Sequence, residues 1–321
     1  MHSKMKRALQ RSELELMVAQ SFGPAVSVDD VRFLEDGWFN TACLIQLSGG
    51  KEVVLKVGPP PEAVTMRYEQ GIMGTEVEVL RLIQEAGVPA PEVYDYNTDR
   101  TILDGEYFFM QKLPGEPYNK IKESLSAEQR ETVEQELGRL NKMINEIQGD
   151  RFGSPAAADR RYGDWPSAFF GMMEDLMKDA EESHTPLPAS SAEILKLVHK
   201  QRGYLEEVLT PKLVHWDLWD GNLFVEEDRI SGIIDCERAL WGDPLMEHYF
   251  RRFADSRAFH QGYGKLDRTP GYEARKLLYD LYLDLILHIE CVFRDYENDG
   301  HRKWAKDNLW ASWQQIANDL K

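Results

Sequence analysis

Residues 213–237 read LVHWDLWDGNLFVEEDRISGIIDCE. Between 223 and 234, two apolar runs flank the polar tip EEDR, a pattern that predicts a β-hairpin. The open ends of a hairpin lie side by side. Asn222, just before the first strand, should therefore sit near Asp235, just after the second.

Asn222 and Asp235 offer oxygen ligands of the kind that Mg²⁺ takes, since Mg²⁺ uses few protein ligands and completes its shell with water and phosphate oxygens. Asp217 lies five residues before Asn222 and is placed to accept a proton from an incoming hydroxyl. His215 is expected to be structural, with a hydrogen bond to the loop backbone near Asp235. This set of groups predicts phosphoryl transfer from ATP, with Asp217 catalytic and the other two holding the metal.

The segments HWDLWDGNLFV and GIIDCE resemble the aminoglycoside phosphotransferase and choline kinase branch of the protein-kinase-like fold, where the loop commonly reads H-G-D-x-x-x-x-N. The resemblance runs along nearly the whole chain and includes the G-D-P turn at 242–244. It implies an α+β, bilobal fold with a small β-rich lobe that carries one long helix, and a larger, mostly helical lobe. The chain departs at Trp216, where Gly is usual, and at Trp219-Asp220. The two indoles either shape the acceptor site or pack against the helical lobe.

The 321 residues suffice for two lobes with real cores. A net charge of -17 argues against nonspecific binding to nucleic acid or to an anionic membrane, and is compatible with a cationic substrate. The three cysteines (Cys43, Cys236, Cys291) are too few and too far apart in sequence to suggest a disulfide framework, which fits a reducing cytoplasm. No window resembles a membrane span or a signal segment. We therefore expect a soluble cytoplasmic protein; its oligomeric state is left open.

The N-terminal part, 1–112, is predicted to be the nucleotide-binding lobe. The periodicity predicts a helix at 12–22 with Ser12 as a cap, and a helix at 67–86 with Val77, Leu80 and Ile83 on one face. Strands are expected at 28–34, 41–47, 51–57, 92–96 and 107–112.

The boundary is placed at Leu113-Pro114-Gly115, so that 113–321 forms the helical lobe with the catalytic loop and the acceptor site. Besides a strand at 212–214 and the hairpin, this part is expected to be helical. The predicted helices are 126–147, 165–182, 190–208, 243–256, 272–295 and 302–319.

A kinase of this type needs a lysine on the third strand for the phosphates and a glutamate on the next helix to orient it. Lys56 ends the apolar run VVLK, where a lysine is costly unless it is paired. The segment TEVEVLRLIQEAGVPAP resembles the corresponding part of the family and assigns the glutamate to Glu76, with Glu78 as the alternative.

The remaining nucleotide contacts are implied by the resemblance. The loop 35–41 should cover the triphosphate through its backbone at Gly37 and through Thr41. Gln111 and Leu113 are expected to supply hinge hydrogen bonds to the adenine. Phe224 and Ile234 should form its apolar walls, or else belong to the core.

The acceptor is expected among the helices after 240 and the 150–180 region. Acidic and aromatic residues there could suit a polyamine sugar, although each alone is more typical of a solvated helix face. They are Asp164, Trp165, Glu237, Trp241, Glu247, Asp284 and Glu290. The sequence predicts a small-molecule kinase of the aminoglycoside type. The alternatives are a fructosamine- or sugar-type kinase, a choline- or homoserine-type kinase, and an inactive nucleotide-binding module. A protein kinase is disfavoured, because no long activation segment follows Asp235.

Overall fold

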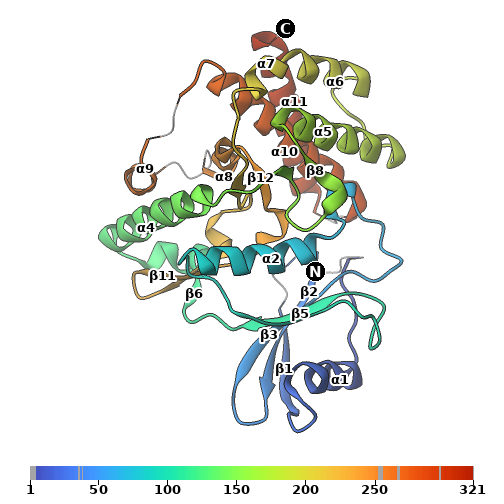
Figure 1. Ribbon diagram of the computed structural model, residues 1–321, viewed down its shortest axis with the longest axis vertical. Coiled ribbons are helices and arrows are strands. Elements are labelled where there is room, and N and C mark those ends of the chain that lie inside the picture. Colours follow the sequence, from blue (N-terminus) through green and yellow to red (C-terminus); the bar gives the residue numbers. More distant parts are fainter. Residues whose placement is uncertain are drawn as a thin grey trace.

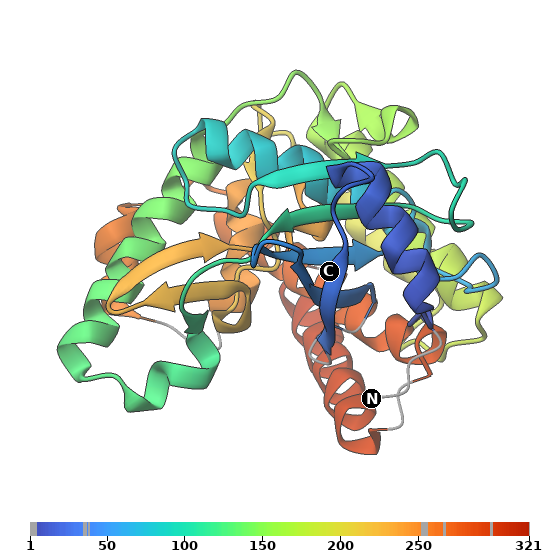
Figure 2. The same ribbon diagram turned by 90° about the horizontal axis from the view of Figure 1, so that it is seen from below.

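The computed structural model of the chain describes residues 5–34, 37, 39–251, 256–265, 268–295 and 298–320. An antiparallel sheet occupies one end and a mostly helical part the other (Figure 1). Figure 2, seen from below, has the sheet end nearest the viewer and the long C-terminal helices behind it. No helix among the described residues is both long and apolar enough to cross a lipid bilayer.

The N-terminal end is built on a five-stranded sheet in the order β1-β2-β3-β5-β4, with every neighbouring pair antiparallel. Its elements are α1 (Arg11–Phe22), β1 (Val28–Leu34), β2 (Thr41–Leu47), β3 (Glu52–Val57), η1 (Arg67–Glu69), α2 (Ile72–Glu85), β4 (Val93–Asn97) and β5 (Tyr107–Gln111). The strand β3, which carries Lys56, is therefore the middle strand. The predicted strands are confirmed to within a residue or two.

Two helix starts differ from the sequence-based expectation. Ser12 lies inside α1; Gln10 precedes the helix, and its backbone N–H is bound by the side chain of Glu13 at 2.7 Å. The predicted helix 67–86 is divided into η1 and α2, because Gly71 takes a φ of 75° that interrupts the helical path. α2 is amphipathic as expected. Its buried face meets the apolar residues that follow the β-hairpin.

The C-terminal part holds two further small sheets, in the orders β11-β10-β6 and β8-β7-β12-β9. Its strands are β6 (Glu116–Pro117), β7 (Phe152–Gly153), β8 (Arg161–Tyr162), β9 (Lys212–Val214), β10 (Leu223–Glu226), β11 (Arg229–Ile233) and β12 (Leu240–Gly242). The hairpin and the strand before the loop 215–222 are confirmed. The two- and three-residue strands β6, β7, β8 and β12 were not foreseen.

The helices of this part pack into two cores, a large aromatic and aliphatic one and a second that they share with α2 and the hairpin (Figure 1). They are α3 (Tyr118–Ile121), α4 (Ala127–Glu146), α5 (Trp165–Glu182), α6 (Ser191–Lys200), α7 (Arg202–Leu205), α8 (His248–Arg251), α9 (Arg257–Tyr263), α10 (Tyr272–Phe293) and α11 (Asp299–Asp319), with short 3₁₀ turns η2 to η6 between them. The expected helix 190–208 is two helices, α6 and α7. The expected helix 243–256 is observed as the turn η6 (Pro244–Glu247) and α8; its residues 252–255 lie outside the described residues.

Helices α4 and α9 touch through two glycines. A Cβ on Gly138 would lie 2.1 Å from the carbonyl oxygen of Phe259, and one on Gly262 would lie 1.9 Å from that of Gln135. Backbone oxygens cannot move aside as a flexible side chain can. The close approach of the two helices therefore depends on both glycines.

We predict that Gly138→Ala lowers the free energy of unfolding by about 3 kcal/mol, because the steric clash outweighs the better helix propensity of alanine. Denaturant unfolding monitored by circular dichroism measures this change. Gly203→Ala is the matched control, since nothing lies within 4 Å of a Cβ at that position, and it should cost nothing. A Gly138→Ala protein as stable as the unmodified chain would contradict the packing described here.

Candidate active site

The side chain of Lys56 joins the sheet to the hairpin. Its Nζ lies 2.5 Å from Glu76 Oε1 on α2 and 2.5 Å from Asp235 Oδ1 at the end of the hairpin. Lys56 is 7% exposed and Glu76 is fully buried. Burial works against the ammonium charge, but the facing carboxylates of Asp235, Glu76 and Glu237 outweigh it and raise the pKa of Lys56. The pairing of Lys56 with Glu76, and not with Glu78, is as predicted.

Asn222 and Asp235, here called the hairpin-end pair, are brought together by the strand register. Leu223 pairs with Ile233, and the N–H of Ile234 donates to the carbonyl of Asn222 at 3.0 Å. Asp235 has a φ of 59°, the left-handed region, and its side chain is 34% exposed. The predicted convergence of the hairpin ends is therefore present in the backbone.

The loop between β9 and β10 is held by His215. Its Nε2 lies 3.0 Å from the carbonyl of Ile234, and the backbone N–H of Asp217 donates to its Nδ1 at 3.2 Å. Nδ1 accepts, so the ring is neutral with its proton on Nε2. The expectation that His215 is structural and bonds the backbone beside Asp235 is confirmed.

We predict that His215 makes the chain less stable as the pH falls. Burial lowers its pKa from 6.5 to about 4. The unfolded chain therefore binds more protons between these values, and stability present above pH 6.5 is lost on the way to pH 4. The linkage amounts to about 3 kcal/mol over this whole range, and to about 2 kcal/mol between pH 7 and pH 5.

Urea unfolding of the unmodified chain and of His215→Asn at pH 7 and pH 5 measures this contribution. His184→Asn is the control, because His184 is exposed and lies outside this loop; it should keep the pH dependence of the unmodified chain. An equally steep pH dependence in His215→Asn would contradict the assignment.

Glu247 anchors the same loop from η6, a role that the sequence did not reveal. Its carboxylate accepts the backbone N–H groups of His215 at 2.8 Å and Trp216 at 3.2 Å. The side chains of Asn141 and Asn145 on α4 donate to it at 3.2 and 3.4 Å. The only signal in the sequence was a pair of asparagines four residues apart on an otherwise apolar helix face. Glu247 therefore supports the loop and does not face an acceptor.

Asp217 is half-buried at the tip of this loop, and the side-chain amide of Asn222 donates to its carbonyl at 2.9 Å. Burial raises the pKa of the Asp217 carboxyl to about 8; Arg238 opposes this rise, and Asp235 and Glu237 add to it. A carboxyl with a pKa near the working pH suits a group that must accept and release a proton.

The cleft gathers four carboxyl groups close to one ammonium. Those of Glu76, Asp217, Asp235 and Glu237 interact electrostatically with Lys56 or with one another, and the guanidinium groups of Arg238 and Arg294 also act on Glu237. Among the described residues, no three His, Cys, Asp or Glu side chains gather as a complete metal cage. An amide oxygen and a carboxylate from the hairpin-end pair, in an acidic cleft, fit a divalent cation that keeps water and phosphate oxygens as its other ligands.

Of the predicted nucleotide contacts, those of the triphosphate loop 35–41 have the least structural support. Glu35, Asp36 and Trp38 lie outside the described residues. The hydroxyl of Thr41 accepts the backbone N–H of Arg7 at 2.7 Å and donates to its carbonyl at 3.1 Å, so it is already engaged. The backbone contact of Gly37 to phosphate stays a prediction.

The expected adenine contacts lie around the junction of β5 and the hairpin. The backbone N–H of Gln111 donates a hydrogen bond to the carbonyl of Glu92 at 2.8 Å, so it is not available to a ligand. Leu113 is buried against Gly232. Phe224 and Ile234 are only partly buried and belong to no core cluster of the described residues, which favours apolar walls over plain core.

Most of the residues expected around the acceptor have other partners. Asp164 caps α5 through the N–H of Ser167 at 2.9 Å, and the buried Asp284 binds the hydroxyl of Ser312 on α11. Trp165 and Trp241 are core residues. Their sequence spacing could not show this, because the partners come from distant segments.

Two residues of that set remain beside the cleft. Glu290 bridges Arg238 at 3.1 Å and Arg294 at 3.2 Å, and Glu237 accepts the side-chain amide of Asn40 at 2.8 Å. Glu237 also lines a cavity next to the catalytic loop, so it is the one whose expected position near an acceptor has structural support.

Residues 30–278 match the model of the phosphotransferase enzyme family. Over 78 residues, 23% of this chain, the sequence is 40% identical to the Synechocystis protein named "Probable ketoamine kinase slr1563"; the matched stretch spans only 25% of that relative.

Among solved structures, aminoglycoside phosphotransferase APH(4)-Ia superposes with a TM-score of 0.67 at 19% identity, covering 97% of this chain and 100% of the other. A Thermobifida fusca protein described as a "putative fructosamine-3-kinase" gives 0.68 at 16% identity, covering 95% and 100%. These likenesses confirm the expected α+β kinase-like fold. Because the family model covers most of the sequence, the chain belongs to the phosphotransferase enzyme family.

Proposed function

We propose that the chain is an ATP-dependent small-molecule kinase that transfers the γ-phosphoryl group to a hydroxyl. The observation that carries this proposal is the double contact of Lys56. It meets Glu76 from α2 and Asp235 from the hairpin, so that a phosphate-binding cation and a metal-binding carboxylate share one cleft.

In the proposed reaction the acceptor oxygen forms a bond to the γ-phosphorus as the bond to the ADP oxygen breaks. The proton of the acceptor hydroxyl passes to Asp217. Lys56, held by Glu76, offsets the charge of the α- and β-phosphates. Asn222 and Asp235 would hold Mg²⁺, which supplies charge neutralisation at the phosphate oxygens.

Structures of relatives support nucleotide binding. A thermostable mutant of APH(4)-Ia was solved in a ternary complex with AMP-PNP and hygromycin B, and its chain superposes on 95% of this one with a TM-score of 0.66. By analogy we place the adenine between Phe224 and Ile234, beside Leu113. The carbonyl of Gln111 is the group that we assign to it, since the N–H is already donated.

Two acceptor classes are favoured by separate observations. The fold resembles aminoglycoside kinases, and the short stretch of 40% identity is to a protein named a ketoamine kinase. Because Asp284 and Glu247 are bound inside the protein and Asp164 caps α5, the expected cluster of free carboxylates for a polyamine sugar is reduced. This favours a ketoamine or another hydroxyl compound of low positive charge.

A coupled assay of ADP release tests the proposal. Kanamycin, hygromycin B, N-fructosyl-lysine, choline and homoserine are each offered with ATP at controlled Mg²⁺. We expect turnover that requires both Mg²⁺ and one class of acceptor. Tight nucleotide binding without turnover across a broad set of hydroxyl compounds would instead support the inactive nucleotide-binding module.

A further inference from the structure

A cavity opens beside the loop 215–222, between η1, α5 and the middle of α10. Among the residues that line it are Tyr68, Arg160, Trp216, Glu237 and Arg238. Trp216 directly precedes Asp217, and Arg238 is close enough to Asp217 to oppose the rise of its pKa. The cavity is therefore next to the proposed catalytic carboxyl.

Trp216 occupies its position at a conformational cost. Its φ is 60°, in the left-handed region where a bulky residue is strained and glycine is not. The indole is 2% exposed and stacks on Tyr282 with ring centroids 5.2 Å apart. Its Nε1–H is buried without a hydrogen-bond partner in the described part of the chain. A strained backbone and an unsatisfied buried donor are both accounted for if the indole N–H serves a ligand.

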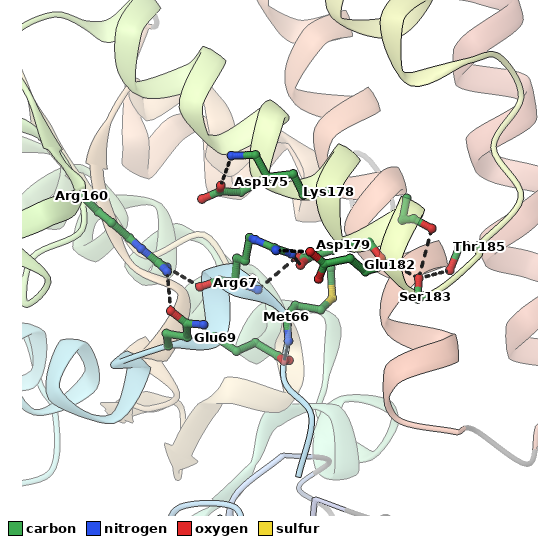
Figure 3. A network of polar contacts seen from close by, with 12 residues as sticks. Met66, Arg67, Glu69, Arg160, Asp175, Lys178, Asp179, Glu182, Ser183 and Thr185 are labelled. Carbon is green, nitrogen blue, oxygen red and sulfur yellow. Dashed lines mark hydrogen bonds and ion pairs between the residues drawn. The ribbon is translucent and has the colours of Figure 1, made fainter. Parts of the chain in front are cut away.

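Arg160 is a cation of this cavity whose hydrogen bonds go to neutral groups. Its guanidinium donates to the carbonyl of Arg67 and, at 2.9 Å, to Gln70 Oε1, both neutral oxygens. It forms no ion pair with any residue that the structure describes. Figure 3 shows the contrast: Arg160 reaches the backbone of η1 from one side, while the guanidinium of Arg67 turns to Asp179 and Glu182 on α5.

The other charges that line the cavity differ from Arg160. Arg238 is paired with Glu290, and Asp175 lies 3.4 Å from Lys178. Glu237 faces Asn40 and is among the carboxylates acting on Lys56, on the phosphate side. Arg160 thus presents to the cavity a guanidinium that forms no ion pair with a described residue, while Asp175 supplies a carboxylate elsewhere in the lining.

We propose that this cavity is the acceptor site and that the acceptor is a hydroxyl compound carrying a carboxylate, which Arg160 binds while the indole N–H of Trp216 donates to an acceptor oxygen. This inference rests on the proposed kinase function. Arginine binds carboxylates through parallel N–H groups, and three of its five remain for a ligand after the two contacts to neutral oxygens. The same charge repels a polycationic acceptor.

Three probes with one polyol skeleton test the charge preference: D-gluconate, D-glucitol and 1-amino-1-deoxy-D-glucitol. They end in a carboxylate, a hydroxymethyl group and an ammonium respectively. Isothermal titration into the chain saturated with Mg²⁺ and ADP measures the affinity of each. We expect gluconate to bind about tenfold or more tightly than the amine, with glucitol between them. Equal affinities, tighter binding of the amine, or no measurable binding of gluconate would overturn the proposal.

Two variants separate the proposed contacts from general damage. Arg160→Gln should bring the three affinities together, and Arg160→Lys should keep part of the preference. Arg151→Gln is the matched control, because Arg151 is exposed nearby and does not line the cavity; it should leave the preference unchanged. A preference that survives Arg160→Gln would also refute the role of Arg160.

Trp216→Phe keeps an aromatic ring and removes the N–H. It should weaken the binding of gluconate and of glucitol by the same several-fold factor, because the hydrogen bond is independent of the probe's charge. Unchanged affinities would exclude Trp216 as a donor. The affinity for Mg²⁺ and ADP, measured on the same protein, distinguishes failure of this inference from failure of the kinase proposal. If the nucleotide binds and the charge preference is absent, only this inference fails; if the nucleotide does not bind, the kinase proposal fails.

Discussion

Asp217→Asn is expected to lower kcat for phosphoryl transfer about a thousandfold, because the amide cannot take the proton of the acceptor hydroxyl. The substitution keeps the size and the polarity of the side chain. The contacts that position the loop here, from the backbone N–H to His215 Nδ1 and from the Asn222 amide to the carbonyl, are made by main-chain atoms of Asp217. They should survive the change. Steady-state ADP release with the identified acceptor measures the loss.

The affinity for nucleotide should stay within a few-fold of the unmodified chain, since Asp217 contributes no ion pair to Lys56. Stability should be equal or slightly higher, because burial already disfavours the charged form of this carboxyl. Asp220→Asn is the control within the same loop; the Asp220 carboxylate pairs with Lys122 at 2.7 Å and not with Lys56. If Asp217→Asn retains full turnover while Asp220→Asn loses it, the catalytic assignment is wrong.

The parts of the site that the sequence predicted are those whose geometry is fixed by a short stretch of chain. The register of one hairpin places Asn222 beside Ile234, and alternation along β3 turns Lys56 toward α2. Such relations follow from strand pairing and helix periodicity, which are visible in the residues themselves.

The parts that the sequence could not predict depend on contacts between distant segments. Glu247 looked like an exposed helix carboxylate, yet it lies 2.8 Å from the N–H of His215, 32 residues earlier. Asp284 was among the residues expected around the acceptor, yet it accepts a hydrogen bond from Ser312 on α11. A carboxylate that is buried in the core and one that binds a ligand are the same residue type with similar neighbours in sequence, so only the tertiary packing distinguishes them.

Lys56→Met is expected to reduce phosphoryl transfer by 10²–10³-fold and also to destabilise the chain. The activity falls because the ammonium that lies between Glu76 and Asp235 is the cation that we assign to the α- and β-phosphates. The stability falls by about 3 kcal/mol, because Glu76 is left as a fully buried carboxylate without its partner. Lys112→Met, which breaks the exposed pair with Glu52, should cost no more than about 1 kcal/mol and leave turnover unchanged.

A second substitution separates the two effects of removing Lys56. In Lys56→Met with Glu76→Gln the buried charge is gone, so denaturant unfolding should recover most of the lost stability. Turnover should not recover, because the ammonium that faces Asp235 is still missing. If restoring stability also restored the rate, the lysine would be a structural counter-ion for Glu76 alone. The same result would mean that the short contact between Lys56 and Asp235 plays no part in phosphate binding.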